Sequence, residues 1–552
     1  MTNRKISQAF RNAFAPVLRK LVIARDVGPA EILRLAKLGL RARMPKRPPP
    51  PPPAMTVEEL QRCTDRSLLR QVFWGYHKNN QLAKMRQAFK RLEDLQRLDP
   101  RVNEIKYLDR LGEKIPPELT VIDHIETGKP LQIEPVYKRI CYFLHNSFPY
   151  SSGGYATRAH GLATALHEKG YDVLATTRPG FPLDNVEDLD ESNVVEAEVI
   201  DGVTYCRLLA PRRRSTKMLD YMLQSADAIE AHLRKHRPAF VMAASNYQTG
   251  FPALLAASRL GLPFAYEVRG FWEITRISRE PKFRKHPSYY IQEFMEAELC
   301  RQANQVFTLT GAMRGELVRR GVPQDHIILL PNACNPKNFL PRPRATALAE
   351  RLGIPAHVPV IGYIGSFVQY EGLENLASAC ALLKKRGLEF RLMIVGNEDV
   401  SGGGLGPIAR KIYAEAHDGG FSDWLIMPGR VPHDEVPDYY SLVDIAPFPR
   451  KPQPVTEMVA PMKPLEAMAM ERAVLVSSVE AMAEMVQNGT TGEIFEKGNI
   501  DDLADKLQLL MTDEHRRKAL GKAARAWVSE RRTWERTSTT ADEVFTAISA
   551  AK

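Results

Sequence analysis

The segment VPVIGYIGSFVQYEGLENL, residues 358–376, contains the pattern that predicts the fold of this 552-residue chain. Val358–Ile364 is a short apolar run typical of a buried strand. Gly365 and Ser366 follow it, and the sequence then leads through Glu371 and Gly372 into an amphipathic helix. Small residues between a strand and a helix let a ligand approach the backbone closely. The segment therefore predicts one strand–loop–helix unit with a candidate binding loop.

Similar units repeat on both sides of this segment. Apolar runs alternate with amphipathic helices from residue 138 onward, which predicts parallel sheets covered by helices on both faces. The stretch Pro331–Pro343 separates two such series, so we expect an α/β fold with two Rossmann-like halves that face a cleft. The predicted strands are Ile140–Leu144, Asp172–Thr176, Val203–Leu208, Phe240–Ala244, Pro263–Val268 and Gln305–Leu309, then Val358–Ile364, Phe390–Val395, Trp424–Met427, Asp444–Phe448 and Ala473–Ser477.

The basic charge of the chain lies mostly at its start. The formal net charge is +11, and residues 1–54 contain twelve Lys and Arg against two acids, which is net +10. Ile6, Phe10 and Phe14 fall on one helical face, so this segment predicts a basic amphipathic helix that can lie on an anionic membrane. A helix docked on the body of the protein or a solvated tail is the alternative. No aromatic residues suited to base stacking interleave with the basic ones, so we expect no nucleic-acid partner.

The remaining chain reads as an ordinary globular protein. Hydrophobic residues make up 44% and charged residues 26%, which excludes a fibre and a wholly disordered chain. The six cysteines form no CxxC pair, which argues against a zinc cluster and fits reduced thiols. No secretory signal or spanning segment is visible, so we expect a cytoplasmic protein, with residues 1–54 as its candidate contact to the cytoplasmic face of a membrane. The expected regions are a basic extension with a polyproline linker (1–54), a helical hairpin for packing or docking (55–115), two Rossmann-like domains (116–340 and 341–515) and C-terminal helices (516–552).

A second segment, PVTEMVAPMKPLEAMA at residues 454–469, contains the residues most suited to chemistry. Its prolines stand where a helix would begin. Lys463 would present positive charge to a phosphate, and Glu466 could accept hydrogen bonds from two sugar hydroxyls. Glu457 precedes the helix and could reach another part of the ligand. The alternative for the two acids is a helix cap and a surface carboxylate.

Several ordered stretches between residues 138 and 545 resemble the family 4 retaining glycosyltransferases, which have the two-domain GT-B fold. They are SGGYATRAHGLATAL, YEVRGFWE, PNACNPKNF, GYIGSFVQYEGLENL, GRVPHDEVPDYYSLVDI and PMKPLEAMAM. The resemblance implies an acceptor domain at 116–340, a nucleotide-sugar donor domain at 341–515, and C-terminal helices that cross back to the first domain. It also implies a loop around Pro331–Pro343 about which the domains close.

The resemblance implies roles for individual residues. On the donor side, Gly153 and Gly154 match the glycine loop, Glu466 the acid that holds the ribose, Glu457 the acid that contacts the sugar, and Arg430 and Val431 the loop beside the base. Gly365 and Ser366 belong to the donor loop of the second half. Glu267 and Arg269 would face the cleft, with Arg269, Glu457 and Lys463 as the catalytic candidates. His145, His160 and Glu267 are candidates for acceptor contact, and local packing is the alternative for the two histidines.

The chain departs from the family pattern at two places. Glu457 and Glu466 stand nine positions apart, one more than usual, which weakens the role of Glu457. The family's common Arg and Lys of the first donor loop are Ser366 and Glu371 here. The chain must therefore find its diphosphate-binding cation elsewhere. Lys463 is the first candidate and Arg269 the second, while Arg450 and Lys451 read as loop charges.

The resemblance implies a reaction without a metal, since Lys, Arg and backbone N–H groups stabilise the leaving diphosphate. The acidic run that contains Asp188 and Asp190 reads as a solvated loop rather than a metal site. We expect a nucleotide-diphosphate sugar as donor, a UDP-sugar before a GDP-sugar. The expected acceptor is a polysaccharide, a lipid-linked glycan or a bacterial surface glycoconjugate, and the configuration is retained. The alternatives are a nucleotide-sugar epimerase of the same fold and a non-catalytic scaffold of a polysaccharide-assembly complex.

Overall fold

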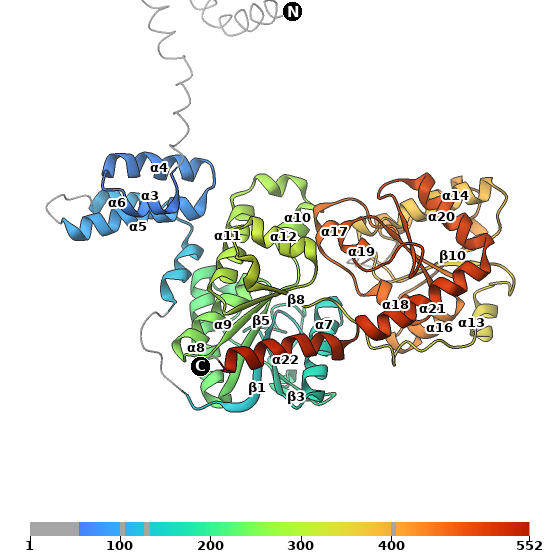
Figure 1. Ribbon diagram of the computed structural model, residues 1–552, viewed down its shortest axis with the longest axis horizontal. Coiled ribbons are helices and arrows are strands. Elements are labelled where there is room, and N and C mark those ends of the chain that lie inside the picture. Colours follow the sequence, from blue (N-terminus) through green and yellow to red (C-terminus); the bar gives the residue numbers. More distant parts are fainter. Residues whose placement is uncertain (1–54, 100–104, 126–132, 399–403, 551–552) are drawn as a thin grey trace, which may run out of the picture. The chain divides into compact units, whose positions relative to one another are not determined.

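The computed structural model describes residues 55–99, 105–125, 133–398 and 404–550 (Figure 1). The predicted basic extension, residues 1–54, lies outside them. The chain divides into two compact units, Met1–Glu104 and Ile105–Lys552, and the second contains both sheets. No helix in the described ranges is long and apolar enough to cross a membrane.

The first unit contains the helices α3 (Val57–Arg62), α4 (Arg66–Lys78) and α5 (Leu82–Leu98). A capping box starts α3, because Thr56 and Glu59 each accept a hydrogen bond from the other's backbone N–H. The apolar faces of α4 and α5 are buried, and the rings of Phe73 and Phe89 lie 6.3 Å apart. This unit ends at Glu104, before the boundary expected at 115, so that α6 (Ile105–Gly112) belongs to the second unit.

The first half of the second unit is built on an eight-stranded sheet in the order β3-β4-β2-β1-β5-β6-β7-β8. All its neighbouring strands are parallel except β3, which runs antiparallel to β4 at the edge. The short edge strands β3 and β8 were not among the predicted strands. The bounds are β1 Val136–Leu144, β2 Asp172–Thr177, β3 Ala197–Ile200, β4 Val203–Cys206, β5 Pro238–Ala244, β6 Phe264–Val268, β7 Gln305–Thr308 and β8 Ile327–Leu329.

The second half is built on a six-stranded parallel sheet in the order β11-β10-β9-β12-β13-β14. Each sheet has helices on its faces, so the predicted pair of Rossmann-like α/β halves is confirmed (Figure 1). The bounds are β9 Val360–Ile364, β10 Arg391–Val395, β11 Leu425–Gly429, β12 Ile445–Phe448, β13 Ala473–Ser477 and β14 Glu493–Phe495.

The helices begin where the sequence offers caps. Asn246, Thr310, Asn499 and Asp513 each accept a backbone N–H in the first turn of α9, α12, α20 and α21. The helices of the first half are α7 Gly154–Glu168, α8 Met218–His236, α9 Tyr247–Arg259, α10 Trp272–Ile277, α11 Pro287–Gln302 and α12 Gly311–Arg319. Those that follow are α13 Thr346–Arg351, α14 Leu373–Lys385, α15 Pro407–Asp418, α16 Val436–Leu442, α17 Pro454–Met458, α18 Lys463–Ala469, α19 Glu480–Ala483, α20 Ile500–Thr512, α21 Glu514–Arg531 and α22 Trp534–Ala550.

The last two helices belong to different halves. Leu520, Ala524 and Val528 of α21 are part of the core of the second half. Ala541 and Phe545 of α22 are part of the core of the first half, and α22 runs along α7 (Figure 1). The fit is close, because a Cβ at Gly161 of α7 would lie 2.4 Å from the ring of Trp534. The C-terminal helices therefore cross from the second half to the first.

Candidate functional site

Two glycine loops lie at the carboxyl ends of neighbouring strands in the second half. Gly365 follows β9 with φ +152°, and Gly396 follows β10 with φ +131°. A Cβ at Gly396 would stand 2.0 Å from the carbonyl oxygen of Gly365, so these loops pack backbone against backbone. Gly396 N–H donates to the carbonyl of Gly429 at the end of β11, which places the exposed Arg430 beside this edge of the sheet. Ligands of such sheets bind at this edge.

Lys463, the first residue of α18, reaches over the Gly365 loop. Its Cε would lie 2.2 Å from a Cβ at Gly365, so the glycine is what makes room for the lysine. The Nζ donates to the Tyr363 hydroxyl at 2.6 Å and to the Ser366 carbonyl at 3.4 Å. Burial lowers the pKa of this ammonium, while the nearby carboxylate of Glu371 opposes the change. The side chain keeps 20% exposure, so Lys463 can reach a ligand at the strand ends.

Glu371 and Arg450 form a buried ion pair beside this lysine. Arg450 donates to both carboxylate oxygens of Glu371, at 2.7 and 3.2 Å, and to the carbonyl of Val459 at 2.7 Å. Burial opposes the charge of Glu371, but Arg450 and Lys463 outweigh it and hold the pKa at about 2. The interpretation of Arg450 as a loop charge was wrong, because the residue is 6% exposed and neutralises an interior carboxylate. Lys451, in contrast, pairs with Glu374 at 2.5 Å.

Glu466 lies one turn after Lys463 on α18. Within the described residues its carboxylate has neither a hydrogen bond nor an ion pair. Burial raises its pKa to about 7, and the positive charge of Lys463 only partly opposes this change. A carboxyl held without a partner in a partly buried place is typical of a binding site.

Glu457 is held by protein groups. One carboxylate oxygen accepts from Lys497 Nζ at 2.8 Å, and the other accepts from the backbone N–H of Glu480 at 2.9 Å. Glu457 thus accepts from the first backbone N–H of α19. A contact between Glu457 and a donor sugar stays a prediction.

The glycine loop of the first half faces the segment that precedes Lys463. Gly153 caps α7 without a side-chain hydrogen bond, and a Cβ there would touch none of the described residues within 4 Å. A Cβ at Gly154 would lie 3.8 Å from Cε of Met462, the neighbour of Lys463. The structure therefore brings the predicted glycine loop and the start of α18 together.

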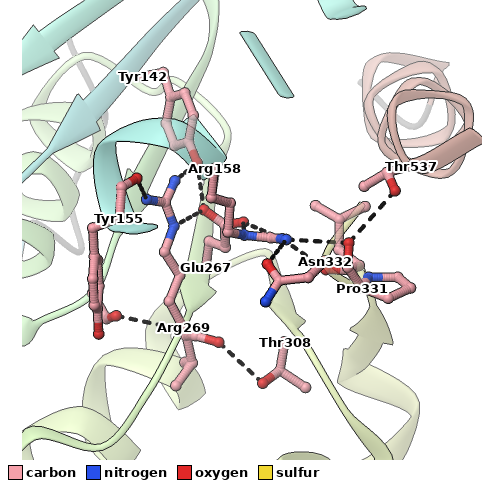
Figure 2. A network of polar contacts seen from close by, with 12 residues as sticks. Tyr142, Tyr155, Arg158, Glu267, Arg269, Thr308, Pro331, Asn332 and Thr537 are labelled. Carbon is pink, nitrogen blue, oxygen red and sulfur yellow. Dashed lines mark hydrogen bonds and ion pairs between the residues drawn. The ribbon is translucent and has the colours of Figure 1, made fainter. Parts of the chain in front are cut away.

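Glu267 and Arg269 lie inside the first half, in the network that Figure 2 shows. Arg269 Nε donates to one carboxylate oxygen of Glu267 at 2.6 Å, and Arg158 Nη2 donates to the other at 2.6 Å. Tyr142 completes the group by bonding to both residues, and Arg269 also donates to the carbonyl of Tyr155. Burial opposes the charge of Glu267, but the two arginines hold its pKa at about 2.

This arrangement differs from the expectation that Glu267 and Arg269 face the cleft. Both side chains are at most 3% exposed, because two arginines must surround a buried carboxylate to keep it charged. Arg269 consequently has its guanidinium bound to protein groups, and its contact with a ligand stays a prediction. The structure places the pair in the interior of the first half.

The same network ties the segment between the halves to the first half, as Figure 2 shows, and Asn332 ties this segment to the second half. Arg158 donates to the carbonyls of Leu330 and Pro331, at 2.7 and 3.1 Å, and to the side chain of Asn332 at 2.9 Å. Asn332 in turn donates to the carbonyl of Ala460 in the second half at 2.7 Å. Arg158 was not among the predicted site residues. Its one signal was an arginine beside Ala156, Ala159 and Leu162 on the buried face of α7.

The two predicted histidines have different surroundings. His145 packs edge-on against Trp272, with ring centroids 4.6 Å apart, and burial lowers its pKa to about 3. Its Nδ1 has no partner among the described residues. His160 bonds to the Tyr205 hydroxyl at 2.9 Å and to Asp201 at 3.0 Å. His160 is therefore held by local hydrogen bonds, while Nδ1 of His145, just after β1, is buried without a partner among the described residues.

Comparisons with known proteins match both halves. The "Glycosyl transferase 4-like domain" family matches residues 153–333, and "Glycosyl transferases group 1" matches residues 345–527. The chain is 26% identical over 215 residues to the GDP-mannose-dependent alpha-(1-6)-phosphatidylinositol monomannoside mannosyltransferase of Mycobacterium tuberculosis. That alignment covers 39% of this chain and 54% of the relative, so it spans about half of the relative's length.

Solved structures match over both halves as well. Sucrose-phosphate synthase from Thermosynechococcus elongatus superposes with a TM-score of 0.61 and 20% identity, covering 75% of this chain and all of that one. Anabaena HepE in complex with UDP and glucose superposes with a TM-score of 0.58 and 14% identity, covering 74% of this chain and 99% of that one. At these identities the matches show that the predicted two-domain GT-B arrangement is the fold of this chain.

Proposed function

The chain belongs to the group 1 glycosyl transferases with a family 4-like first half, and from this premise we propose that it transfers a sugar from a nucleotide-diphosphate sugar to an acceptor hydroxyl. The observation that carries the proposal is the pair on α18. Lys463 offers an ammonium, and Glu466 offers a carboxyl that has no partner among the described residues. Both lie at the carboxyl ends of the strands and opposite the glycine loop of the first half.

Lys463 and Glu466 are suited to bind the diphosphate and the ribose, respectively, of a nucleoside diphosphate. Lys463 would neutralise charge that grows on the diphosphate as the bond between the anomeric carbon and the phosphate oxygen breaks. Glu466 would accept hydrogen bonds from the two ribose hydroxyls. Arg430 and Val431 would lie beside the base, and the backbone at Gly153 and Gly154 would approach the diphosphate from the other side.

The proposed reaction needs no metal, because the ammonium and backbone N–H groups supply the positive charge. The acceptor oxygen attacks the anomeric carbon on the face that the diphosphate leaves, and its proton passes to the leaving phosphate oxygen. The product therefore retains the anomeric configuration. His145, with its neutral ring, is the acceptor-side candidate at the end of β1.

The donor and acceptor classes follow from chemistry and from the relatives. UDP is the first candidate nucleotide, since HepE was solved with UDP and glucose, and GDP is the second, since the mycobacterial relative is named for GDP-mannose. That relative's named acceptor is a glycolipid, which supports a lipid-linked glycan or a polysaccharide as acceptor here. We place the chain at the cytoplasmic face of a bacterial membrane, with residues 1–54 as the contact.

A donor screen tests the function. A thermal-shift panel of UDP- and GDP-sugars identifies the donor, because a ligand that binds only the folded state raises its melting temperature. Proton NMR of the chain with that donor then follows the first anomer released, by slow hydrolysis or to an added acceptor. A released sugar of the donor's own configuration supports retention, whereas the opposite anomer contradicts it. Conversion of the donor into another nucleotide sugar without acceptor would indicate an epimerase.

Lys463→Met is the decisive variant. It should lower turnover of the donor about 100-fold, since one charge-assisted contact to the leaving group is removed. Lys451→Met is the matched control, because Lys451 is a neighbouring lysine that has its own partner, Glu374. Equal turnover of Lys463→Met and the wild type would contradict the assignment of the diphosphate site and favour a non-catalytic scaffold.

A further inference from the structure

We propose that Glu371 and Arg450 are positioning residues for the donor diphosphate: Arg450 neutralises Glu371, which leaves the ammonium of Lys463 in place and free to bind the diphosphate. The inference rests on the proposed function and adds to it a cluster of three charges, Glu371, Arg450 and Lys463. It explains how a donor loop with an acid at position 371 can serve an anionic substrate.

Distances show which cation neutralises the acid. Arg450 donates two hydrogen bonds, of 2.7 and 3.2 Å, to the Glu371 carboxylate, whereas Lys463 Nζ lies 3.8 Å from the same carboxylate. The first contact is a two-point charge-assisted pair, and the second is beyond hydrogen-bond range. Glu371 is thus satisfied by Arg450, and the lysine keeps its capacity to bind another anion.

The guanidinium of Arg450 is bound to protein groups and is nearly inaccessible to a ligand. Its Nη1 donates to the carbonyl of Val459 at 2.7 Å, its guanidinium lies 5.6 Å from the centre of the Tyr370 ring, and the residue is 6% exposed. Lys463 has the opposite character, with 20% side-chain exposure and bonds to an uncharged hydroxyl and a carbonyl. Arg450 therefore acts through Glu371, and Lys463 is the residue that meets the diphosphate.

The net charge of the cluster determines whether it offers the diphosphate a cation. With all three groups charged, the cluster is net +1. Without Arg450, a carboxylate this deeply buried would draw the Lys463 ammonium onto itself, since an unpaired buried charge is strongly unfavourable. The cluster would then be neutral, and the diphosphate would lose its cation. Without both Glu371 and Arg450, Lys463 alone would again give net +1.

A double-variant cycle tests this coupling, with UDP and GDP as probes in isothermal titration calorimetry on the full chain. Arg450→Gln should weaken binding of the nucleotide that the wild type prefers at least about tenfold, the value of one lost charge-assisted contact. Glu371→Gln combined with Arg450→Gln should bring affinity back to within about threefold of the wild type. Lys451→Met, at the neighbouring lysine paired with Glu374, should leave affinity unchanged.

The rescue separates positioning from a general structural role. If Arg450 bound the diphosphate directly, or only stabilised the loop, the double variant would bind as weakly as Arg450→Gln or more weakly, and the inference would be overturned. Circular dichroism melts show whether each variant folds. If Arg450→Gln fails to fold, the double variant alone tests the inference. It removes both charges of the buried pair and therefore leaves no unpaired charge in the interior. Wild-type-like affinity then supports the inference, and a loss as large as that of Lys463→Met contradicts it.

The cycle also separates this inference from the proposed function. A wild-type chain that binds neither UDP nor GDP contradicts the proposed function and this inference together. A wild-type chain that binds one of them, with binding lost in Lys463→Met but not restored in the double variant, leaves the proposed function in place and rejects the role of Glu371 and Arg450.

Discussion

Glu466 is a carboxyl whose charge depends on pH near neutrality, and this has a consequence for ligand binding. Its ordinary pKa of 4.5 is raised to about 7 by burial. Ribose hydroxyls would bind the ionised form, so below pH 7 the free protein must first release a proton. Affinity for UDP or GDP should therefore fall roughly tenfold per pH unit below 7 and stay level above it.

Calorimetric titrations at pH 8, 7 and 6 check this prediction for Glu466. Glu466→Gln is the control, because it cannot ionise, and it also shows how much of the pH dependence comes from the phosphates of the nucleotide. Parallel pH profiles of the wild type and Glu466→Gln would contradict the prediction.

The same raised pKa affects the free energy of unfolding in the absence of ligand. Between pH 4.5 and about 7 the folded chain keeps the proton of Glu466 that the unfolded chain has released. The free energy of unfolding should therefore fall as pH rises through this window and stay lowered above it. Urea melts of Glu466→Gln should show higher stability than the wild type at pH 8 and no difference at pH 4. A variant less stable than the wild type at pH 8 would contradict this.

Gly365 is the second residue with a specific prediction. Gly365→Ala should lower the free energy of unfolding by about 2 kcal/mol and weaken nucleotide binding, because the new Cβ would displace Lys463 and φ +152° strains any other residue. Gly353→Ala is the matched control. Gly353 also has a positive φ, +66°, but a Cβ there would contact no atom within 4 Å in the part of the chain that the structure describes. It should lose about 1 kcal/mol without a change in nucleotide binding, so equal binding losses would contradict the prediction.

At the residue scale, the sequence indicates charged groups that are close together on one helix, but not ion pairs between distant segments. Lys463 and Glu466 were found because a lysine and an acid three residues apart must share one end of a helix. Arg450 was interpreted as a loop charge and Arg158 was missed, because their partners, Glu371 and Glu267, lie 79 and 109 positions away along the chain. Only the packing of distant segments shows that such charges are buried.

At the scale of single elements, α22 contributes to the free energy of unfolding through one buried aromatic residue, Phe545. Phe545 packs against Tyr171, Phe240 and Phe307, with ring centroids 6.0, 4.5 and 6.2 Å away, and is 2% exposed. Phe545→Ala should therefore lower the free energy of unfolding by about 3–5 kcal/mol, the usual range for a buried aromatic residue. Urea denaturation of the full chain measures this loss.

Leu509→Ala is the control for Phe545→Ala. Leu509 lies on α20 and is 38% exposed, so its truncation should cost within about 0.5 kcal/mol. A loss of similar size in both variants would show that α22 is not a structural part of the first half.

Element prediction from the sequence succeeded where apolar runs were long. The central strands, such as β1, β5 and β9, were found because their residues are apolar on both faces. The missed strands β3, β8 and β14 are three or four residues long, and β3 alternates exposed with partly exposed residues. Short edge strands have little hydrophobic pattern, and neighbouring strands rather than their own sequence define them.

For the whole molecule, the uneven charge distribution predicts that membrane contact and nucleotide binding belong to different parts of the chain. Deleting residues 1–54 removes net +10 and should release the protein from vesicles that contain an anionic lipid such as phosphatidylglycerol. Nucleotide binding should be unchanged, because the proposed donor site lies in the second half. Co-sedimentation with vesicles and calorimetry on the truncated and full-length chains check the two statements. Vesicle binding that survives the deletion would contradict a membrane role for this segment.

The place of α22 also bears on how the chain is made on the ribosome. Domains usually fold as they emerge, the first one before the next is complete. Here part of the core of the first half is supplied by Phe545, which follows Leu329, the end of β8 and of the first half's sheet, by 216 positions. The core of the first half therefore stays incomplete, with apolar surface exposed, until the second half and α22 have been translated. Chaperone demand during synthesis should accordingly depend on when α22 emerges rather than on the domain boundary.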